Sequence, residues 1–202
     1  MDNSTRNQIL ITAAGEMLAK GFRGVSMRSI ASKVGITPIK LYRHFSNKEA
    51  LFDALVEPAT TALKPVYEKR RDRAASAMQA GGPSAMWEAD AGAFVWIVQY
   101  VYSHYDAFKL LICCSADTRY SNYPDQLVEF FQKDTEAFLE KAKSSGEVNK
   151  DLVLREVLIL LRAQLNAFFD IVRQDFTYDE ALHFALTLEN FFRPSWQALL
   201  KL

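Results

Sequence analysis

The spacing of apolar side chains along the chain predicts helices from end to end. In the first segment Leu10, Ala13 and Met17 recur at intervals of three and four residues, which is the repeat of one helix face. The alternation of apolar and polar residues that marks a half-buried strand does not persist in any segment. We therefore predict an all-α protein.

Capping residues and glycines divide this pattern into nine predicted helices. Ser, Thr and Asn favour helix starts, proline is tolerated in the first turn, and glycine favours helix ends. Thr37 before Pro38 is one such start, and the capping box of Thr177 and Glu180 is another. The predicted helices cover approximately residues 5–20, 27–34, 38–44, 46–73, 84–103, 105–114, 122–146, 152–174 and 178–200.

The fourth predicted helix carries signals of its own. Ser46 and Glu49 form a capping box at its start, while Pro58 and Pro65 predict kinks within it. The run of Ala, Gly, Gly and Pro at 80–83 is the clearest break in the chain, so a new helix should follow it.

Charge is distributed unevenly along a chain that is neutral as a whole. There are 24 basic and 24 acidic residues, which gives a formal net charge of zero. Residues 1–48 nevertheless hold eight Lys and Arg against Asp2 and Glu16, a balance of +6, so the remainder carries −6. This cationic segment 1–48, called the head below, precedes an anionic remainder, which predicts that the head binds a polyanion. The alternative is scattered, solvated surface charge.

The composition disfavours several classes of protein. No secretory signal pattern opens the chain, and no apolar run reaches the roughly 18 to 20 residues of a membrane span. Cys113 and Cys114, the only cysteines, are adjacent, which leaves neither a disulfide framework nor a four-ligand zinc site. His44, His104 and His183 lie far apart, and no catalytic motif occurs. We predict a cytoplasmic protein without enzyme activity, metal, cofactor or membrane segment.

Residues 26–45 have the pattern of two short helices joined by a tight turn. Ala31 is small where the helices approach each other, and Gly35 permits the positive φ that a sharp turn needs. A shared apolar core is supplied by Ile30, Val34, Ile36, Leu41 and Phe45. Several side chains outside this core can donate hydrogen bonds to phosphate or base edges. The segment is therefore a predicted helix-turn-helix.

The segment from Val34 to Leu51, VGITPIKLYRHFSNKEAL, resembles the TetR family of bacterial transcriptional regulators. The matching residues are the turn Gly35-Ile36-Thr37, the pairs Leu41-Tyr42 and His44-Phe45, then Lys48 and Leu51. By motif the resemblance covers residues 5–55, and beyond them it rests on length, helix number and the closing pair of long helices. It implies a helix-turn-helix DNA-binding domain at 1–48 and a helical effector-binding and dimerisation domain at 49–202.

The resemblance implies nine DNA contacts. Each of them, taken alone, has a solvated surface position as its alternative. Ser26 and Arg28 are expected to contact phosphate or to reach the groove, and phosphate contacts are expected from Tyr42, His44 and Lys48. Base edges are expected to face the start of the second short helix, at Thr37, Pro38, Ile39 and Lys40. Lys40 suits a guanine, and the apolar Ile39 or Pro38 suits a thymine methyl group.

One short recognition helix reads only a few base pairs, so specificity needs a second copy at a fixed spacing. The last two predicted helices carry apolar stripes that would form a four-helix interface with their symmetry mates, as the family does. The predicted contacts are Leu158, Leu161, Leu165, Leu188, Phe192 and Trp196. The alternative is that these stripes pack only within one chain.

The middle helices are rich in aromatic residues, and there the resemblance implies a pocket for a small effector. The candidate lining residues are Trp96, Tyr100, Phe131, Gln164 and Phe168, with plain core packing as the alternative. The implied function is a ligand-responsive repressor that binds a pseudo-palindromic operator in double-stranded DNA as a homodimer. A small, mainly apolar effector would release it. Open alternatives are an effector-independent or architectural DNA-binding protein, a helical enzyme, and a redox trigger at Cys113 and Cys114.

Overall fold

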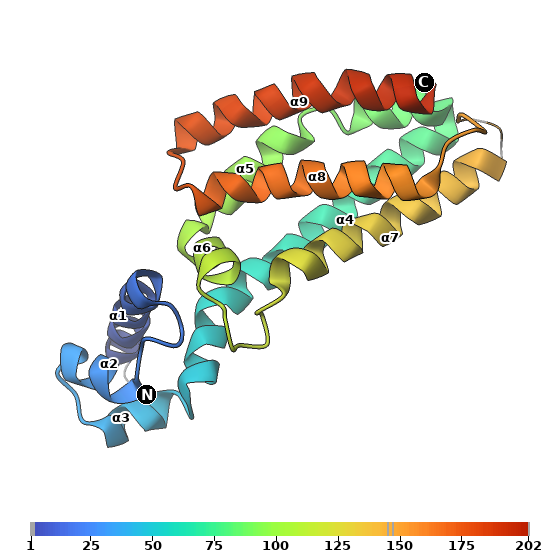
Figure 1. Ribbon diagram of the computed structural model, residues 1–202. Coiled ribbons are helices and arrows are strands. Elements are labelled where there is room, and N and C mark those ends of the chain that lie inside the picture. The colour runs from blue at the N-terminus through green and yellow to red at the C-terminus, as the bar shows by residue number, and fades with distance from the viewer. Residues whose placement is uncertain (1–2, 145, 147, 202) are drawn as a thin grey trace. The chain divides into compact units, whose positions relative to one another are not determined.

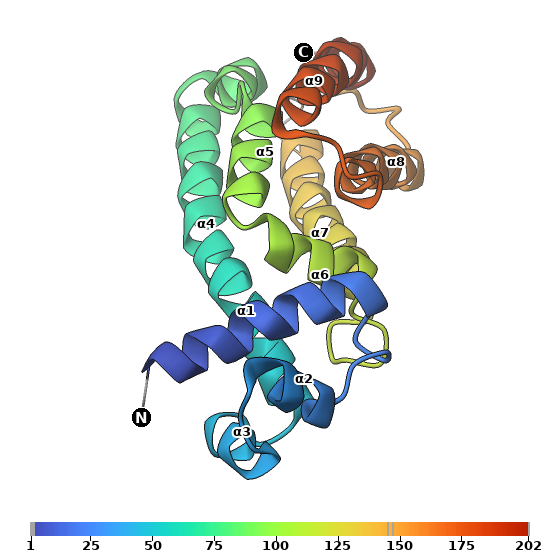
Figure 2. The ribbon, with the colours of Figure 1, turned by 90° about the vertical axis from the view of Figure 1, so that its left-hand side faces the viewer.

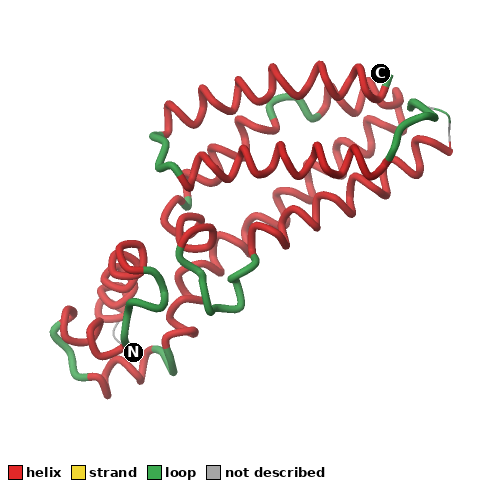
Figure 3. The backbone as a smooth tube through the Cα atoms, in the orientation of Figure 1, coloured by secondary structure: helices red, strands yellow, loops and turns green. Residues whose placement is uncertain are grey.

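A computed structural model of the chain describes residues 3–144, 146 and 148–201. Throughout these residues the regular elements are helices joined by short loops, without a strand (Figure 3). This confirms the predicted all-α class. Asp2, which enters the predicted charge balance, lies outside the described residues.

Nine helices follow one another in the described part of the chain (Figure 1). They are α1 (Asn3–Lys20), α2 (Met27–Val34), α3 (Pro38–His44), α4 (Lys48–Ala89), α5 (Ala93–Ser103), α6 (Tyr105–Cys113), α7 (Tyr123–Ser144), α8 (Leu154–Arg173) and α9 (Tyr178–Leu200). The number of helices and most of their boundaries agree with the prediction, and side-chain caps are present at the starts of α2, α3, α4 and α9.

Three predicted boundaries were wrong. The fourth helix, expected to end at 73, continues to Ala89 and is interrupted only at Gly81 and Gly82. The helix expected from 84 to 103 is interrupted by a turn at 90–92, where Gly92 has a φ of 75° and α5 begins directly afterwards. At the start of α4 the cap is Asn47 rather than Ser46, since the Asn47 side chain accepts the Ala50 N–H at 2.7 Å. Asn is as good a cap as Ser, so the sequence pattern could not choose between neighbours.

Helix α4 runs through both prolines and is interrupted at the predicted glycines. Its backbone is helical except at Gly81 and Gly82, and Gly82 has a φ of 73°. Pro58 and Pro65 therefore leave the helical backbone angles intact, while the break expected at 80–83 is present.

By packing, the chain forms two compact units. The first contains residues up to 62 together with 104–123, and the second contains 63–103 together with the chain from 124 onward. The predicted boundary after residue 48 concerns function and stays a prediction. The packing itself assigns α6 and the loop after it to the same unit as α1, α2 and α3.

The first unit has a continuous apolar core. Helix α1 packs against α2 and α6, and α2 packs against α3 (Figure 2). The fully buried side chains come from five helices: Ile9, Ala13, Met17, Ile30, Ala31, Leu41, Leu51, Phe52, Val56, Leu110 and Leu111. Short helices such as α3 are not stable alone, so this shared core holds them in place.

The second unit is a bundle in which α9 packs against both α5 and α8. Its buried residues include Val98 of α5, Val128 of α7 and Ala185 of α9. Polar links between its helices include the bond in which the Tyr67 hydroxyl of α4 donates to Asp134 Oδ2 of α7 at 2.7 Å. Burial, reinforced by the Asp134 carboxylate, raises the pKa of Tyr67, so this hydroxyl stays protonated as a donor.

Candidate nucleic-acid interface

Helix α2 starts at a cap that involves one of the predicted phosphate contacts. Ser26 has extended backbone angles, and its hydroxyl accepts the Ser29 N–H at 3.1 Å. The Ser29 hydroxyl is in turn within 3.2 Å of the Ser26 N–H, which completes a capping box. Ser26 and Arg28 are both exposed, so the capped first turn faces solvent.

The turn between α2 and α3 has the geometry that the sequence predicts. Gly35 adopts a φ of 75°, and its N–H donates to Ser32 O at 3.2 Å, while the Ile36 N–H donates to Ala31 O at 3.0 Å. Ala31 is completely buried. A side chain at Gly35 would strain the backbone, so the sharp turn that brings α3 back depends on glycine.

Helix α3 is anchored on one face and exposed on the other. Thr37 caps it by accepting the Lys40 N–H at 3.2 Å, and Leu41 is buried beneath it. On the outer face Ile39 is 71% exposed and Tyr42 49% exposed. The remaining exposed residues of this face are Thr37, Pro38, Lys40 and Arg43. An exposed isoleucine at the tip of a cationic helix suits an apolar contact with a base.

The other two predicted phosphate contacts are partly buried. His44 is half-buried, and its buried Nδ1 atom has no hydrogen-bond partner within the described chain, so only Nε2 could reach a phosphate. Lys48 is also half-buried, and its ammonium donates to Phe22 O at 2.8 Å and to Val25 O at 2.9 Å. Seven of the nine predicted contacts are thus exposed, and two have partly enclosed polar atoms.

Half of the eight cations counted in the head are occupied elsewhere. Lys20 and Lys33 both pair with Glu16, Arg23 pairs with Asp117, and Lys48 binds backbone carbonyls. By contrast, Arg28, Lys40 and Arg43 are exposed and have no ion pair or hydrogen bond to a side chain among the described residues. The eighth cation, Arg6 of α1, is half-buried and lies 5.1 Å from the centre of the Phe45 ring. The three exposed cations without a side-chain partner therefore lie on the first turn of α2 and on α3.

Glu16 is a residue that sequence reasoning did not single out. Its carboxylate lies nearly buried between Lys20 of the same helix and Lys33 of α2. These two hydrogen-bonded ammonium groups lower the pKa of Glu16 below its ordinary value. Glu16 therefore joins α1 to α2, and only the spacing to Lys20, four residues on, was visible in the sequence.

Replacing Glu16 with glutamine is expected to flatten the acid sensitivity of the first unit. A carboxyl whose pKa is lowered by folding stabilises the folded state above its unfolded pKa, about 4.3, and loses this contribution as the pH falls through the folded pKa. Denaturant unfolding at pH 7, 5, 4 and 3 would measure it. Glu129→Gln, which removes an exposed carboxylate without an ion pair among the described residues, is the control. Parallel loss of stability in Glu16→Gln and wild type would contradict this assignment.

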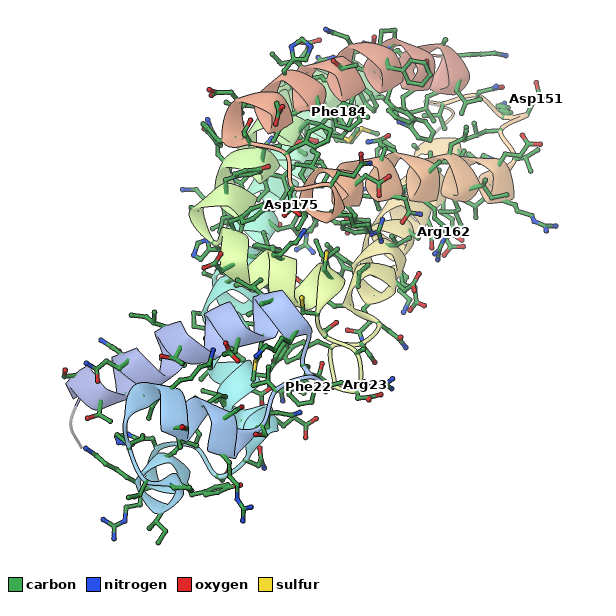
Figure 4. The ribbon with its side chains drawn as sticks, turned by 60° about the vertical axis from the view of Figure 1, so that its left-hand side comes forward. Phe22, Arg23, Asp151, Arg162, Asp175 and Phe184 are labelled. Atoms are coloured by element: carbon green, nitrogen blue, oxygen red, sulfur yellow. The ribbon has the colours of Figure 1, made fainter. Side chains whose placement is uncertain are left out.

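The segment after α6 also belongs to the first unit and contacts the loop between α1 and α2. Phe22 and Arg23 lie on this loop (Figure 4). The Phe22 N–H donates to Cys114 O at 3.1 Å, and Arg23 forms a two-pronged pair with Asp117. Sequence reasoning missed this pair, because nothing local signals a partner 94 residues away.

Arg119 forms a second ionic cluster in the same unit. Its Nε lies 3.1 Å from Asp53 Oδ1, and a terminal nitrogen pairs with Glu57, so the segment binds the first turns of α4. Cys113 is exposed and Cys114 is buried. The redox trigger at this cysteine pair stays an open alternative.

The predicted pocket residues lie in separate contacts of the second unit. The rings of Trp96 and Tyr100 are 6.0 Å apart, Phe131 lies beside Tyr67, and Phe168 is buried. Gln164 Oε1 accepts the Trp196 indole N–H at 2.6 Å. The open hollows on this unit include one of about 410 Å³ lined by side chains within 176–184 and one near Asn149, and neither of these contains a predicted pocket residue. The effector site stays a prediction.

The predicted dimer contacts are mostly half-buried in the single chain. Leu188 is buried, Trp196 donates to Gln164, and the other four are half-buried: Leu158, Leu161, Leu165 and Phe192. The apolar residues that α8 and α9 do expose are their neighbours, Ile159 at 58%, Leu160 at 44%, Leu186 at 50% and Phe191 at 67%. Both helices thus present an apolar outer face, one position away from most of the predicted residues.

The described residues offer little for other kinds of site. They contain no group of three or more His, Cys, Asp and Glu side chains that could hold a metal ion. None of the helices in this part of the chain combines the length and the hydropathy required to cross a membrane.

Comparison with known proteins supports the interpretation of the first unit. The family model of the bacterial regulatory proteins, tetR family, matches residues 9–55. An uncharacterized HTH-type transcriptional regulator of Haemophilus influenzae is 28% identical over 115 residues, covering 56% of this chain and 52% of the relative. The HTH-type transcriptional repressor KstR2 of Mycobacterium tuberculosis is 39% identical over 54 residues, 27% of each chain. The chain thus matches about half the length of the first relative and about a quarter of the second.

The fold as a whole also has solved counterparts. The crystal structure of NalD, described as the secondary repressor of the MexAB-OprM multidrug efflux pump in Pseudomonas aeruginosa, covers 98% of both chains with a TM-score of 0.63. The two sequences are 19% identical, so this likeness concerns the fold alone. Residues 9–55 thus match the model of the tetR family of bacterial regulatory proteins, and the nine helices of the described chain have the fold of NalD.

Proposed function

We propose that this protein is a transcriptional regulator that binds an operator in double-stranded DNA through α2 and α3. The observation that carries the proposal is the distribution of available cations. Arg28, Lys40 and Arg43 are exposed without a side-chain partner in the described chain, whereas Lys20, Arg23, Lys33 and Lys48 are occupied. Phosphates attract such unpaired cations, and the release of counterions contributes much of the affinity.

The arrangement of α3 supports base recognition. Its first turn presents Ile39 and Lys40 at the exposed end of a short, firmly capped helix. Base contacts in helix-turn-helix proteins come from the amino-terminal residues of the second helix. Lys40 would donate to a guanine, Ile39 would contact a thymine methyl group, and Thr37 and Pro38 would lie beside them.

We further propose that the operator is pseudo-palindromic and that the protein binds it as a homodimer. Helix α3 has only seven residues, so one copy contacts few base pairs, and two copies are needed for specificity. The exposed apolar residues of α8 and α9 support a partner subunit on the outer face of these two helices. The six residues predicted from the sequence, which are buried or half-buried, would lie beneath this interface. Such a face on two adjacent helices is suited to a four-helix interface.

The proposal includes repression that is released by a small, mainly apolar effector. Trp96 and Tyr100 of α5 supply the aromatic surface, with Arg70 of α4 stacked 5.2 Å above the Trp96 ring. We propose that the effector binds best to a conformation in which the two DNA-binding units of the dimer are differently spaced. Such an effector would weaken operator binding by the coupling free energy between the effector site and the DNA site, typically about 1–3 kcal/mol. We assign the protein no catalytic role and no cofactor, and a cytoplasmic location, where a bacterial operator lies.

Selection from a random-sequence duplex pool tests the central proposal. The protein is expected to enrich one family of duplexes with two half-sites, and its affinity for them should fall steeply as salt concentration rises. Enrichment of no sequence, with binding insensitive to salt, would refute operator binding. A thermal-shift screen with small apolar compounds separates the effector-gated regulator from an architectural protein of the same fold, because only the former should be stabilised by a ligand that also releases DNA.

Two alanine substitutions should affect operator binding in different ways. Lys40→Ala is expected to relax preference at one base pair in each half-site, by about 1–3 kcal/mol. Arg28→Ala should instead weaken all duplexes alike and reduce the salt slope by about one unit, because one phosphate is no longer neutralised. Binding of the selected duplex and of single-base variants would be measured for both. A uniform effect of Lys40→Ala across these duplexes would remove Lys40 from base recognition.

A further inference from the structure

We propose that Arg43 is a specificity-determining residue that donates to the major-groove edge of a guanine, at a base pair other than the one that Lys40 reads. This inference rests on the proposed DNA binding and adds a second guanine to each half-site of the operator. The nine contacts expected from the sequence do not include Arg43, which the structure shows exposed on α3.

Two buried side chains fix the rotation of α3. Leu41 is completely buried, and Phe45, the residue that ends the helix, is only 4% exposed. The Phe45 N–H donates to Leu41 O at 3.0 Å, and the guanidinium of Arg6 lies 5.1 Å from the centre of the Phe45 ring. Because residues four apart are neighbours on a helix surface, Leu41 and Phe45 hold one side of α3 against the core of the first unit.

Arg43 lies on the side of α3 that faces away from these anchors. Successive residues of a helix are rotated by about 100°, so Ile39 and Arg43, each two positions from Leu41, are rotated by about 200° from it. Ile39 is 71% exposed, and Arg43 is exposed as well. Since Ile39 and Arg43 are four residues apart, they share the outer face of α3. A groove that admits Ile39 therefore also meets Arg43.

The other two exposed side chains of this part of α3 flank the outer face. Lys40 and Tyr42 adjoin Leu41 in the sequence, one on each side, so each is rotated by only about 100° from the buried direction. Their side chains therefore leave the helix toward the two walls of a groove. Arg43, between them on the outer face, is directed toward the floor, where the base edges lie.

The guanidinium of Arg43 has its donors available. Arg43 has no ion pair or hydrogen bond to a side chain among the residues that the structure describes. The five N–H groups of an arginine form a planar fork. In the major groove this fork matches guanine, which presents two acceptors, O6 and N7, whereas adenine places a donor beside its N7. The base that suits Arg43 is therefore guanine.

The rise of the helix separates the bases that are read. Lys40 and Arg43 are three residues apart, about 4.5 Å along the axis, which exceeds the step of about 3.4 Å between base pairs. Ile39 and Arg43 are about 6 Å apart, close to two such steps. Arg43 and Lys40 thus contact different base pairs, and the guanine of Arg43 lies about two base pairs from the thymine of Ile39.

Substitution of single base pairs in the operator tests this assignment. The probe is the duplex that the wild-type chain enriches from a random pool, and each G·C pair of one half-site is replaced in turn by A·T. Loss of the guanine that Arg43 reads is expected to raise the Kd of wild type by about 5- to 150-fold, the range of one bidentate contact. The same replacement should leave the Kd of Arg43→Ala unchanged, and Lys40→Ala should be insensitive at a different guanine. Relaxation of one and the same base pair in both variants would overturn the proposal.

Arg28→Ala is the matched control for the loss of a cation. Arg28 is likewise an exposed arginine without a side-chain partner in the described chain, and it lies on α2. Its truncation should weaken the whole set of duplexes alike, as expected for a phosphate contact. Uniform weakening in Arg43→Ala as well would assign Arg43 to a phosphate and contradict base recognition.

A modified base and a conservative variant separate the groove contact from an effect of DNA shape. The analogue 7-deazaguanine keeps the base pair but lacks the N7 acceptor, so it should weaken binding by wild type and not by Arg43→Ala. Arg43→Lys keeps the charge but has no planar fork. This variant should retain the salt dependence of wild type and lose part of the preference for that guanine. An equal effect of the analogue on wild type and Arg43→Ala would refute the contact.

The same measurements distinguish this inference from the proposed function. If the wild type enriches no duplex, the proposed function fails, and this inference fails with it. If the wild type enriches an operator and Arg43→Ala keeps its preference at every guanine, only this inference fails. Because Arg43 is exposed, thermal unfolding of Arg43→Ala should match wild type, so that a changed base preference reports on recognition and not on folding.

Discussion

Phe52→Ala is expected to lower the free energy of unfolding of the first unit by about 3–5 kcal/mol, the usual cost of truncating a buried phenylalanine. Phe52 is completely buried, and its ring packs against Phe22 at 5.5 Å and Tyr120 at 5.9 Å. These three rings come from the loop before α2, from α4 and from the segment after α6. Removal of the central ring would therefore separate the recognition helices from the parts of the chain that hold them.

Peptide-resolved hydrogen exchange and denaturant unfolding would measure this change. Exchange should accelerate in residues 3–62 and 104–123, the two segments of the first unit, more than in the second unit. Phe130→Ala is the control, because Phe130 is 45% exposed and lies in the second unit. A loss below about 1 kcal/mol in Phe52→Ala, which is ordinary for an exposed site, would show that the three rings do not form the core of the unit.

Local chemistry made the helix-turn-helix predictable from sequence. Ser26, Thr37 and Gly35 act in the structure as their types indicate, two as caps and one as a turn with positive φ. Each of these residues acts on backbone groups within about four positions, so its signal is contained in a short window. The same reasoning correctly placed the capping box at Thr177 and Glu180.

Contacts between distant segments could not be predicted in this way. Arg23 meets Asp117 across 94 positions, and Arg119 meets Glu57 across 62. Lys48 is an example, because the sequence motif alone shows a cation and does not show its hydrogen-bond partners. Only the fold shows that Phe22 O and Val25 O lie within reach of its ammonium. Counting charges along the sequence therefore includes four cations that the structure shows bonded within the first unit.

The dimer residues show a different limit of helix periodicity. A repeat of three and four identifies an apolar stripe but does not tell whether that stripe faces its own chain or a partner. Leu188 belongs to the inward stripe of α9, whereas Leu186 and Phe191 are exposed on the same helix. The assignment of an outer face required the burial of each residue, which depends on how α5 and α8 pack against α9.

The double substitution of Ile159 and Phe191 by glutamate is expected to convert a dimer into a monomer. Both side chains are more than half exposed, at 58% and 67%, so the substitutions should not disturb the core of the single chain. In a dimer, however, they would place unpaired carboxylates in an apolar interface, which is strongly unfavourable. Loss of the second half-site should weaken operator binding by about 10²- to 10⁴-fold, the range over which linked sites gain affinity.

Sedimentation equilibrium and operator titration would test this prediction together. Val66→Glu is the matched control, since Val66 is an exposed apolar residue of α4 in the same unit and lies outside the proposed interface. The control should remain dimeric and bind DNA as wild type does. A double variant that stayed dimeric would place the interface elsewhere. A monomeric variant with unchanged operator affinity would show that each α3 binds independently, and recognition would then have to come from the seven residues of one helix.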